Sequence, residues 1–159
     1  MTESPGTIEK LIEESRLVAQ APDKSALAAL LEEAEHDIVA ADANLLTFGS
    51  WADAMLYESG LRSARAIVQA AGYRIVACDR AHVTTIDAAD ALTGGAHHAA
   101  FIRLHRMRRR RNEFMYAATA EPTASDTQQA RQDASLLSSV ARQAVADLAS
   151  GQGRSEAPR

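Results

Sequence analysis

Apolar residues recur at intervals of three or four along most of the chain, which is the spacing of one helix face. The pattern is clearest between residues 24 and 46, where Leu27, Leu31, Ala34 and Ile38 share a face and most acidic residues lie opposite. The same reading along the whole chain predicts six helices and no strand. Their expected ranges are 5–19, 24–46, 51–71, 81–92, 96–120 and 125–149.

Proline, glycine and capping residues indicate where these helices begin and end. Ser4 is the expected N-cap of the first helix, with Pro5 at its first position. Ser50 is expected to cap the third helix, and Gly72 to follow its last residue. The two glycines after Thr93 separate the fourth helix from the fifth.

Two segments are expected to lie outside the helices. Residues 73–80 (YRIVACDR) show no clear period, so we expect a loop whose Ile75 and Val76 reach the core. Residues 151–159 are rich in Gly, Ser and Pro, which predicts a disordered tail. The chain therefore reads as one helical domain, residues 1–150, followed by a short tail.

Composition supports this reading and narrows the fold class. A chain of 159 residues suits one domain. Alanine dominates its apolar residues, and aromatic residues make up 4%; such a mixture suits closely packed helices better than sheets. Because the connections are short, neighbouring helices are expected to be antiparallel. We predict an all-α, up-and-down bundle of five to six helices.

Cysteine content and hydropathy indicate a cytoplasmic protein. A single Cys excludes an internal disulfide, and no apolar run reaches the roughly 18 residues of a membrane span. The acidic N-terminus lacks the basic and apolar pattern of a signal peptide. Among the five histidines, only Glu33-x-x-His36 has the spacing of metal ligands. It lacks a second copy, so we expect a solvated helix face there, and no metal or cofactor.

The formal net charge of −4 conceals a strong asymmetry along the chain. Residues 1–49 carry ten acids against three bases, whereas residues 50–120 carry six acids against ten bases. The positive charge is concentrated between Arg103 and Arg111. The overall charge argues against a general polyelectrolyte binder, but this cluster leaves a phosphate-binding site open.

The helix expected over residues 96–120 carries two stripes of different character. Its core-facing stripe holds one arginine, Arg111, among apolar residues. The other members of that stripe are Phe101, Leu104, Met107, Phe114 and Ala118. A polar stripe lies about 100° around the helix. Its members are His105, Arg108, Arg109, Asn112 and Tyr116.

Arg111 is costly in an apolar stripe unless its guanidinium finds partners or reaches a cleft. Spacing and charge alone leave two interpretations about equally supported. In one, the arginines form a solvated basic face from which Arg111 extends to water. In the other, Arg111 binds an RNA or nucleotide phosphate, while Asn112 and Tyr116 position the sugar or base.

The arrangement Arg111-Asn112-x-x-x-Tyr116 in the penultimate helix resembles the signature of the HEPN family (higher eukaryotes and prokaryotes nucleotide-binding domains). In that signature an Arg is usually followed by a polar residue, a few further residues and a His. The Ala-rich helix around LRSARAIVQAAGYR, the short helix led by His82 and the order of the helices also resemble the family. The resemblance covers residues 4–150.

The resemblance implies a metal-independent ribonuclease in which two protomers place their signature helices along one cleft. Arg111 would bind phosphate and stabilise the transition state, and Asn112 would hold the backbone or orient Arg111. The family's His, which activates the ribose 2′-hydroxyl, is replaced by Tyr116. Because an ordinary Tyr has a pKa of about 10, this replacement removes the obvious base. Tyr116 can still donate a hydrogen bond to phosphate or stack on a base.

The resemblance also suggests where other contacts fall. Arg108, Arg109 and His105 would bind RNA, and His105 of a partner protomer is a weaker candidate for the missing imidazole. Expected partners are RNA, a second copy of the chain, and a cognate antitoxin or a nucleotidyltransferase. In some HEPN toxins such an enzyme adenylylates a Tyr near the signature; Tyr116 is an improbable acceptor because that Tyr follows the His.

Several other residues have a structural interpretation as their first reading. His82 is expected to cap or pack near the fourth helix; the alternative is a role in the cleft. Cys78 is expected to be partly buried, and Trp51 to lie in the core or at a dimer contact. Small residues on the third helix allow close approach of another helix, and the last helix is apolar on one face. One of these faces is expected to support a homodimer.

Three functions remain open at this point. The first is a toxin or defence endoribonuclease acting on cellular RNA. The second is a catalytically silent HEPN module that binds RNA or a nucleotide, or scaffolds a partner protein. The third is a helical interaction protein whose arginines meet an acidic partner. The RNA target, the partner and the roles of His82 and His105 are not determined by the sequence.

Overall fold

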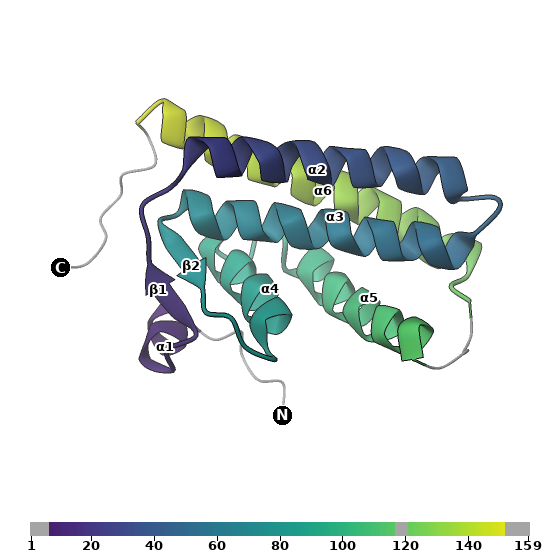
Figure 1. Ribbon diagram of the computed structural model, residues 1–159, viewed down its shortest axis with the longest axis horizontal. Coiled ribbons are helices and arrows are strands. Elements are labelled where there is room, and N and C mark those ends of the chain that lie inside the picture. The colour runs from purple at the N-terminus through teal and green to yellow at the C-terminus, as the bar shows by residue number, and fades with distance from the viewer. Residues whose placement is uncertain (1–6, 117–120, 152–159) are drawn as a thin grey trace.

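The computed structural model describes residues 7–116 and 121–151, and this part of the chain folds as a helical bundle (Figure 1). Six helices and two short strands follow one another along it. They are α1 (Ile8–Glu13), β1 (Leu17–Ala19), α2 (Lys24–Asn44), α3 (Gly49–Ala70), β2 (Tyr73–Ile75), α4 (Ala81–Leu92), α5 (His98–Tyr116) and α6 (Ala124–Ala149). The all-α prediction is confirmed. Across the described residues, no helix combines the length and the hydropathy needed to cross a membrane.

Helix α3 lies at the centre of the bundle and contacts α2, α4, α5 and α6. Figure 1 shows α2, α3 and α6 running along the long axis, with α4 and α5 on the other side of α3. Small residues let these neighbours approach: a Cβ on Gly60 would lie 2.6 Å from Leu104 Cδ1 of α5. The small-residue face expected to support a dimer is therefore largely used inside the protomer, where Ala52, Ser59 and Ala66 are fully buried.

The N-terminal segment differs from the helix expected over residues 5–19. Helix α1 begins after Thr7, whose hydroxyl accepts a hydrogen bond from the Lys10 amide, and ends at Glu13. Ser15 then takes a left-handed backbone conformation with φ +55°, which reverses the chain. The expected cap, Ser4, lies outside the described residues.

Leu17–Ala19 forms the strand β1, which pairs antiparallel with β2. The expected helix over Leu17–Ala19 and the expected loop over residues 73–75 were therefore both wrong. Leu17 faces Ile75 in this register and is fully buried. Ile75 packs against the core, as predicted. Neither short strand had a partner nearby in sequence to reveal it, because strand pairing is set by contacts across more than fifty residues.

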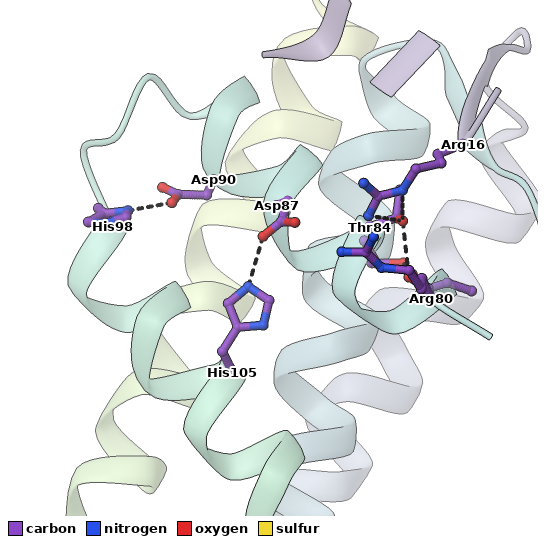
Figure 2. Close-up of polar contacts among 9 residues, drawn as sticks. Arg16, Arg80, Thr84, Asp87, Asp90, His98 and His105 are labelled. Atoms are coloured by element: carbon purple, nitrogen blue, oxygen red, sulfur yellow. Dashed lines mark hydrogen bonds and ion pairs between the residues drawn. The ribbon is translucent and has the colours of Figure 1, made fainter. Parts of the chain in front are cut away.

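Arg16 links this small sheet to α4. Its Nε and Nη2 donate hydrogen bonds to the Thr84 hydroxyl at 3.0 and 2.8 Å (Figure 2). The Thr84 hydroxyl in turn donates to the Arg80 carbonyl, one turn earlier. The N-terminal segment is therefore attached to the first turns of α4 as well as to β2.

Most of the predicted helix boundaries lie close to the observed ones. Helix α4 spans the predicted residues, and Gly72 follows α3 with φ +91°, a conformation that suits glycine. Thr123 and Asp126 form a capping box at the start of α6. The start of α3 is different: Phe48 is its N-cap without a side-chain hydrogen bond, so Ser50 is not a cap. The predicted tail falls almost wholly outside the described residues.

Arginine–aspartate pairs join the helices across the bundle. Arg103 of α5 donates from Nε and Nη2 to Asp133 of α6, at 2.6 and 2.9 Å. Arg131 of α6 makes a similar two-bonded pair with Asp42 of α2, at 2.8 and 3.1 Å. The pairs differ in burial, because the Asp133 side chain is 7% exposed and the Asp42 side chain is 43% exposed.

Two buried serines one turn apart on α3 differ in hydrogen bonding. Ser59 donates its hydroxyl to the Ala34 carbonyl of α2 at 2.7 Å. The Ser63 hydroxyl is equally buried and has no hydrogen-bond partner among the described residues. An unpaired buried hydroxyl destabilises the folded state, whereas a paired one does not.

We predict opposite effects when each serine is replaced by alanine. Ser63→Ala is expected to raise the free energy of unfolding by about 0.5–1.5 kcal/mol, because it removes an unpaired polar group and improves helix propensity. Ser59→Ala is expected to lower it by about 1 kcal/mol. Urea unfolding followed by circular dichroism measures both. A loss of stability in Ser63→Ala would contradict this assignment.

The two arginine–aspartate pairs are expected to differ in their contribution to stability. Asp133→Asn is predicted to lower the free energy of unfolding by about 1.5–3 kcal/mol, because it weakens charge-assisted hydrogen bonds in a buried setting. Asp42→Asn, the matched change at an exposed pair, is predicted to cost less than about 1 kcal/mol. Equal losses in urea titrations of the two variants would show that burial does not decide the effect.

Candidate functional site

Helix α5 carries the arginine cluster and lies against α3, α4 and α6. Its predicted apolar stripe is confirmed at Phe101, Leu104 and Met107, which are all buried. The helix therefore turns a fixed face toward the core, and this orientation decides where each arginine goes. The described side chains of α5 end at Glu113, so the predicted stripe members Phe114 and Ala118 lie outside them.

Two arginines of the cluster hold helices together. Arg103 is bound by Asp133, and Arg110 donates from Nη2 to the buried Asp53 of α3 at 3.1 Å. Asp53 is only 6% exposed, so the guanidinium compensates a carboxylate that would otherwise be costly inside the bundle. The acids that relieve repulsion along α5 thus come from other helices.

Arg111 turns back onto α3. Its Nη2 lies 2.9 Å from Glu58 Oε1, and its guanidinium carbon lies 5.6 Å from the centre of the Tyr57 ring. The side chain is 32% exposed. The solvated-face interpretation of Arg111 is therefore too simple, because the guanidinium is stacked on an aromatic face and paired with one carboxylate.

Tyr57 joins Arg111 to a histidine of α4. The Tyr57 side chain is fully buried, and its hydroxyl is hydrogen-bonded to His82 Nδ1 at 2.9 Å. Burial, with the nearby Glu58 carboxylate, raises the pKa of Tyr57 to about 12. The phenol is therefore a neutral hydrogen-bonding group throughout the physiological range.

Two further arginines surround this pair. Arg108 of α5 is half-buried, and its Nε has no hydrogen-bond partner within the described part of the chain. Arg65 of α3 lies close enough to oppose the charging of His82. Burial lowers the pKa of His82; Arg111, Arg65 and Arg108 lower it further, and Glu58 partly opposes them. His82 is thus a neutral imidazole among three guanidiniums.

We call this arrangement the Arg111 cluster. Its members are Tyr57, Glu58 and Arg65 of α3, His82 of α4, and Arg108 and Arg111 of α5. The sequence pointed to Arg108 and Arg111, and it assigned His82 first to capping or packing near the fourth helix. It did not single out Tyr57, Glu58 or Arg65. The sequence feature that could have indicated them is Tyr57, in an Ala-rich helix, with Arg65 two turns later on the same face.

The remaining predicted residues of α5 have different settings. Arg109 and Asn112 are exposed, so the structure does not bring them into the Arg111 cluster. The backbone of Tyr116 ends α5, but its side chain lies outside the described residues. Of the predicted signature residues Arg111, Asn112 and Tyr116, Arg111 is the one whose described side chain contacts α3 in the Arg111 cluster.

His105 is joined to α4 instead of facing outward with the arginines. Its Nε2 donates to Asp87 at 2.9 Å, as Figure 2 shows. Two turns earlier on α5, His98 Nδ1 donates to the nearly buried Asp90 at 2.5 Å. These two pairs attach α5 along α4, which gives His105 a structural contact that the sequence did not suggest.

Glu33 and His36 of α2, the two residues with the spacing of metal ligands, each lie within ion-pair distance of another side chain. Glu33 lies 3.1 Å from Arg62 of α3, and His36 lies 4.0 Å from Glu32 of the same helix. Over the residues that the structure describes, no group of three or more His, Cys, Asp and Glu side chains is arranged to hold a metal. Cys78 is exposed, so the expectation that it is partly buried was wrong.

Two cavities lie apart from the Arg111 cluster. A small one of about 110 Å³ lies between α5 and α6 beside Arg103, Arg106 and Arg110. A larger groove of about 610 Å³ lies between the α2–α3 connection and the start of α6. Phe48 and Trp51, which line this groove, are both more than half exposed, so Trp51 is not a core residue.

Comparisons with other proteins leave the family open. The chain matches no protein-family model, no curated protein and no solved structure. The fold class therefore follows from the structure, and the HEPN resemblance still depends on the residues of α5 and the order of the helices.

Proposed function

We propose that this chain is a HEPN-type, metal-independent endoribonuclease that acts on cellular RNA. The observation that carries the proposal is the Arg111 cluster, in which the Arg111 guanidinium lies over the Tyr57 ring and the charges of Arg65 and Arg108 are close enough to lower the pKa of His82. Among the described residues, Glu58 is the carboxylate that raises the pKa of both Tyr57 and His82. Such a group favours an anion and can stabilise the charge that develops on a phosphate.

Arg111 would be the phosphate-binding residue of this site. Its guanidinium is held by Glu58 and the Tyr57 ring, which fixes its position. A phosphate would compete with Glu58 for the same guanidinium edge, because both ligands accept from Nη2. Arg108 adds a second positive charge near the same position, because it lies close enough to lower the pKa of His82.

The exposed polar residues of α5 would extend the contact to RNA. Arg109 and Asn112 are exposed, and they adjoin Arg108 and Arg111 in the sequence. Either residue could contact a nucleotide or a second protomer. The HEPN resemblance implies that two copies of α5 line one cleft. We therefore include a homodimer in the proposal, with an antitoxin or nucleotidyltransferase as its expected cellular partner.

A catalytically silent HEPN module is the second candidate. The observation that favours it is the ion pair of Arg111 with Glu58, which already satisfies part of the signature arginine. In that case the same face would bind RNA or a nucleotide, or would scaffold a partner protein, without cutting RNA. Binding and cleavage are therefore measured separately in the tests below.

We predict opposite effects of Glu58 and Arg111 on RNA affinity. Arg111→Gln is expected to weaken RNA binding about 10-fold or more, because it removes a charge-assisted contact to phosphate. Glu58→Gln is expected to strengthen binding, because it frees Arg111. Filter binding over a salt series measures both, and the slope against salt should decrease by about one in Arg111→Gln. Matched controls are Arg106→Gln and Glu113→Gln, which alter exposed residues of α5 by the same charges.

Cleavage is tested by incubating the purified protein with total RNA in EDTA. Scission that leaves 2′,3′-cyclic phosphate ends and is lost in Arg111→Gln supports the endoribonuclease. Salt-sensitive binding without scission would support the silent module instead. If Arg111→Gln and Arg106→Gln weaken binding equally, the Arg111 cluster is not the RNA site.

A further inference from the structure

His82 is held at one nitrogen and open at the other. Its Nδ1 is hydrogen-bonded to the Tyr57 hydroxyl, and Tyr57 is fixed because its side chain is fully buried. Nε2 lies on the opposite side of the ring and has no hydrogen-bond partner among the described residues. The imidazole is half-buried, so it is oriented by the bundle without being sealed inside it.

We propose that His82 is the general base of this chain, in place of the histidine that is missing at position 116. The inference rests on the proposed endoribonuclease and names the group that accepts the proton. The 2.9 Å contact between Nδ1 and the Tyr57 hydroxyl is compatible with either tautomer, and general-base action uses the one in which Nδ1–H donates to the Tyr57 oxygen and Nε2 carries the lone pair. Tyr57 is then a positioning residue, because it acts through His82.

The step balances with the groups present and water. His82 Nε2 takes the proton of the ribose 2′-hydroxyl, and the 2′-oxygen forms a bond to the adjacent phosphorus. The bond between phosphorus and the 5′-oxygen breaks; its electron pair leaves with that oxygen, which takes a proton from water. The products are a 2′,3′-cyclic phosphate and a 5′-hydroxyl, and His82 later returns its proton to solvent.

The surroundings keep His82 in the form that a base requires. The groups that act on it are Glu58 and Arg65 of α3 and Arg108 and Arg111 of α5, with Tyr57 as its hydrogen-bond partner. Burial and the three arginines lower the pKa of His82, so the ring is neutral at pH 7. A neutral imidazole can accept a proton, whereas an imidazolium cannot.

Other histidines of the chain are less suited to this role. His98 and His105 each direct a ring nitrogen to an aspartate of α4. His36 lies on α2, which shows no ion pair or hydrogen bond to the Arg111 cluster among the described residues. His82 is the histidine that the structure places against the ring on which Arg111 stacks.

The test compares cleavage and binding in the same variants. His82→Gln is expected to slow RNA cleavage in EDTA by about 100-fold or more, the typical contribution of a general base, while RNA affinity stays that of the wild type. His82→Ala should regain activity when imidazole is added. His36→Gln is the matched control and should cleave normally. Thermal unfolding by circular dichroism identifies any variant that has lost its fold, and imidazole rescue then decides the role independently.

The pH profile distinguishes a base from a merely structural residue. Wild-type cleavage should rise through an acid limb whose midpoint lies below 6.5, the ordinary pKa of histidine. Arg65→Gln should move that midpoint up, because it removes a charge that disfavours the imidazolium. Tyr57→Phe should also move it, because the phenol no longer holds Nδ1, although the ring under Arg111 is kept.

The possible results separate the two proposals. If the wild type cuts RNA and His82→Gln cuts equally fast, His82 is not the base but the endoribonuclease stands. If the wild type cuts, and His82→Gln binds RNA but does not cut it, both proposals are supported. If the wild type binds RNA and never cuts it, the endoribonuclease fails and the general base fails with it.

Discussion

Helix α5 packs into the bundle because acids of other helices neutralise its cations. Asp133 of α6 and Asp53 of α3 accept hydrogen bonds from the guanidiniums of Arg103 and Arg110. Asp87 of α4 accepts a hydrogen bond from the His105 ring. Without them, the helix would bring a row of guanidiniums against an apolar core, which is strongly unfavourable. Each pair also fixes the rotation of α5, and that rotation directs Arg111 toward α3.

The same ion pairs explain why only some arginines of α5 are available to a ligand. Arg103 and Arg110 are engaged by nearly buried aspartates and serve the fold. Arg111 is bound by Glu58, whose side chain is 29% exposed, against 6% for Asp53 and 7% for Asp133. Because ion pairs weaken as their exposure to water increases, Glu58 yields to a phosphate more easily than Asp53 or Asp133.

Local patterns in the sequence were sufficient for the long helices and insufficient for the strands. The limits of α4 and the capping box of α6 depend on residues within a few positions of each other. The β1–β2 pair depends on the contact between Leu17 and Ile75, which are far apart in the sequence. The spacing of apolar residues within one segment carries no information about such a contact. For the site, the stripe on α5 identified Arg111, but Glu58 and His82 lie 53 and 29 positions away in the chain. Their meeting is a property of how α3, α4 and α5 pack, so it required the structure.

The attachment of Arg16 to Thr84 links residues 7–20 to the helix that carries the His82 imidazole. Thr84 lies two positions after His82, in the first turns of α4. The strand that precedes α4 in the chain is β2, and β2 is paired with β1. The N-terminal segment therefore contacts α4 directly, through Arg16 and α1, and pairs with β2, the strand before α4. A chain without this N-terminal segment would keep every residue of the Arg111 cluster. We expect the hydrogen bond between the Tyr57 hydroxyl and His82 Nδ1 to be held less firmly in it.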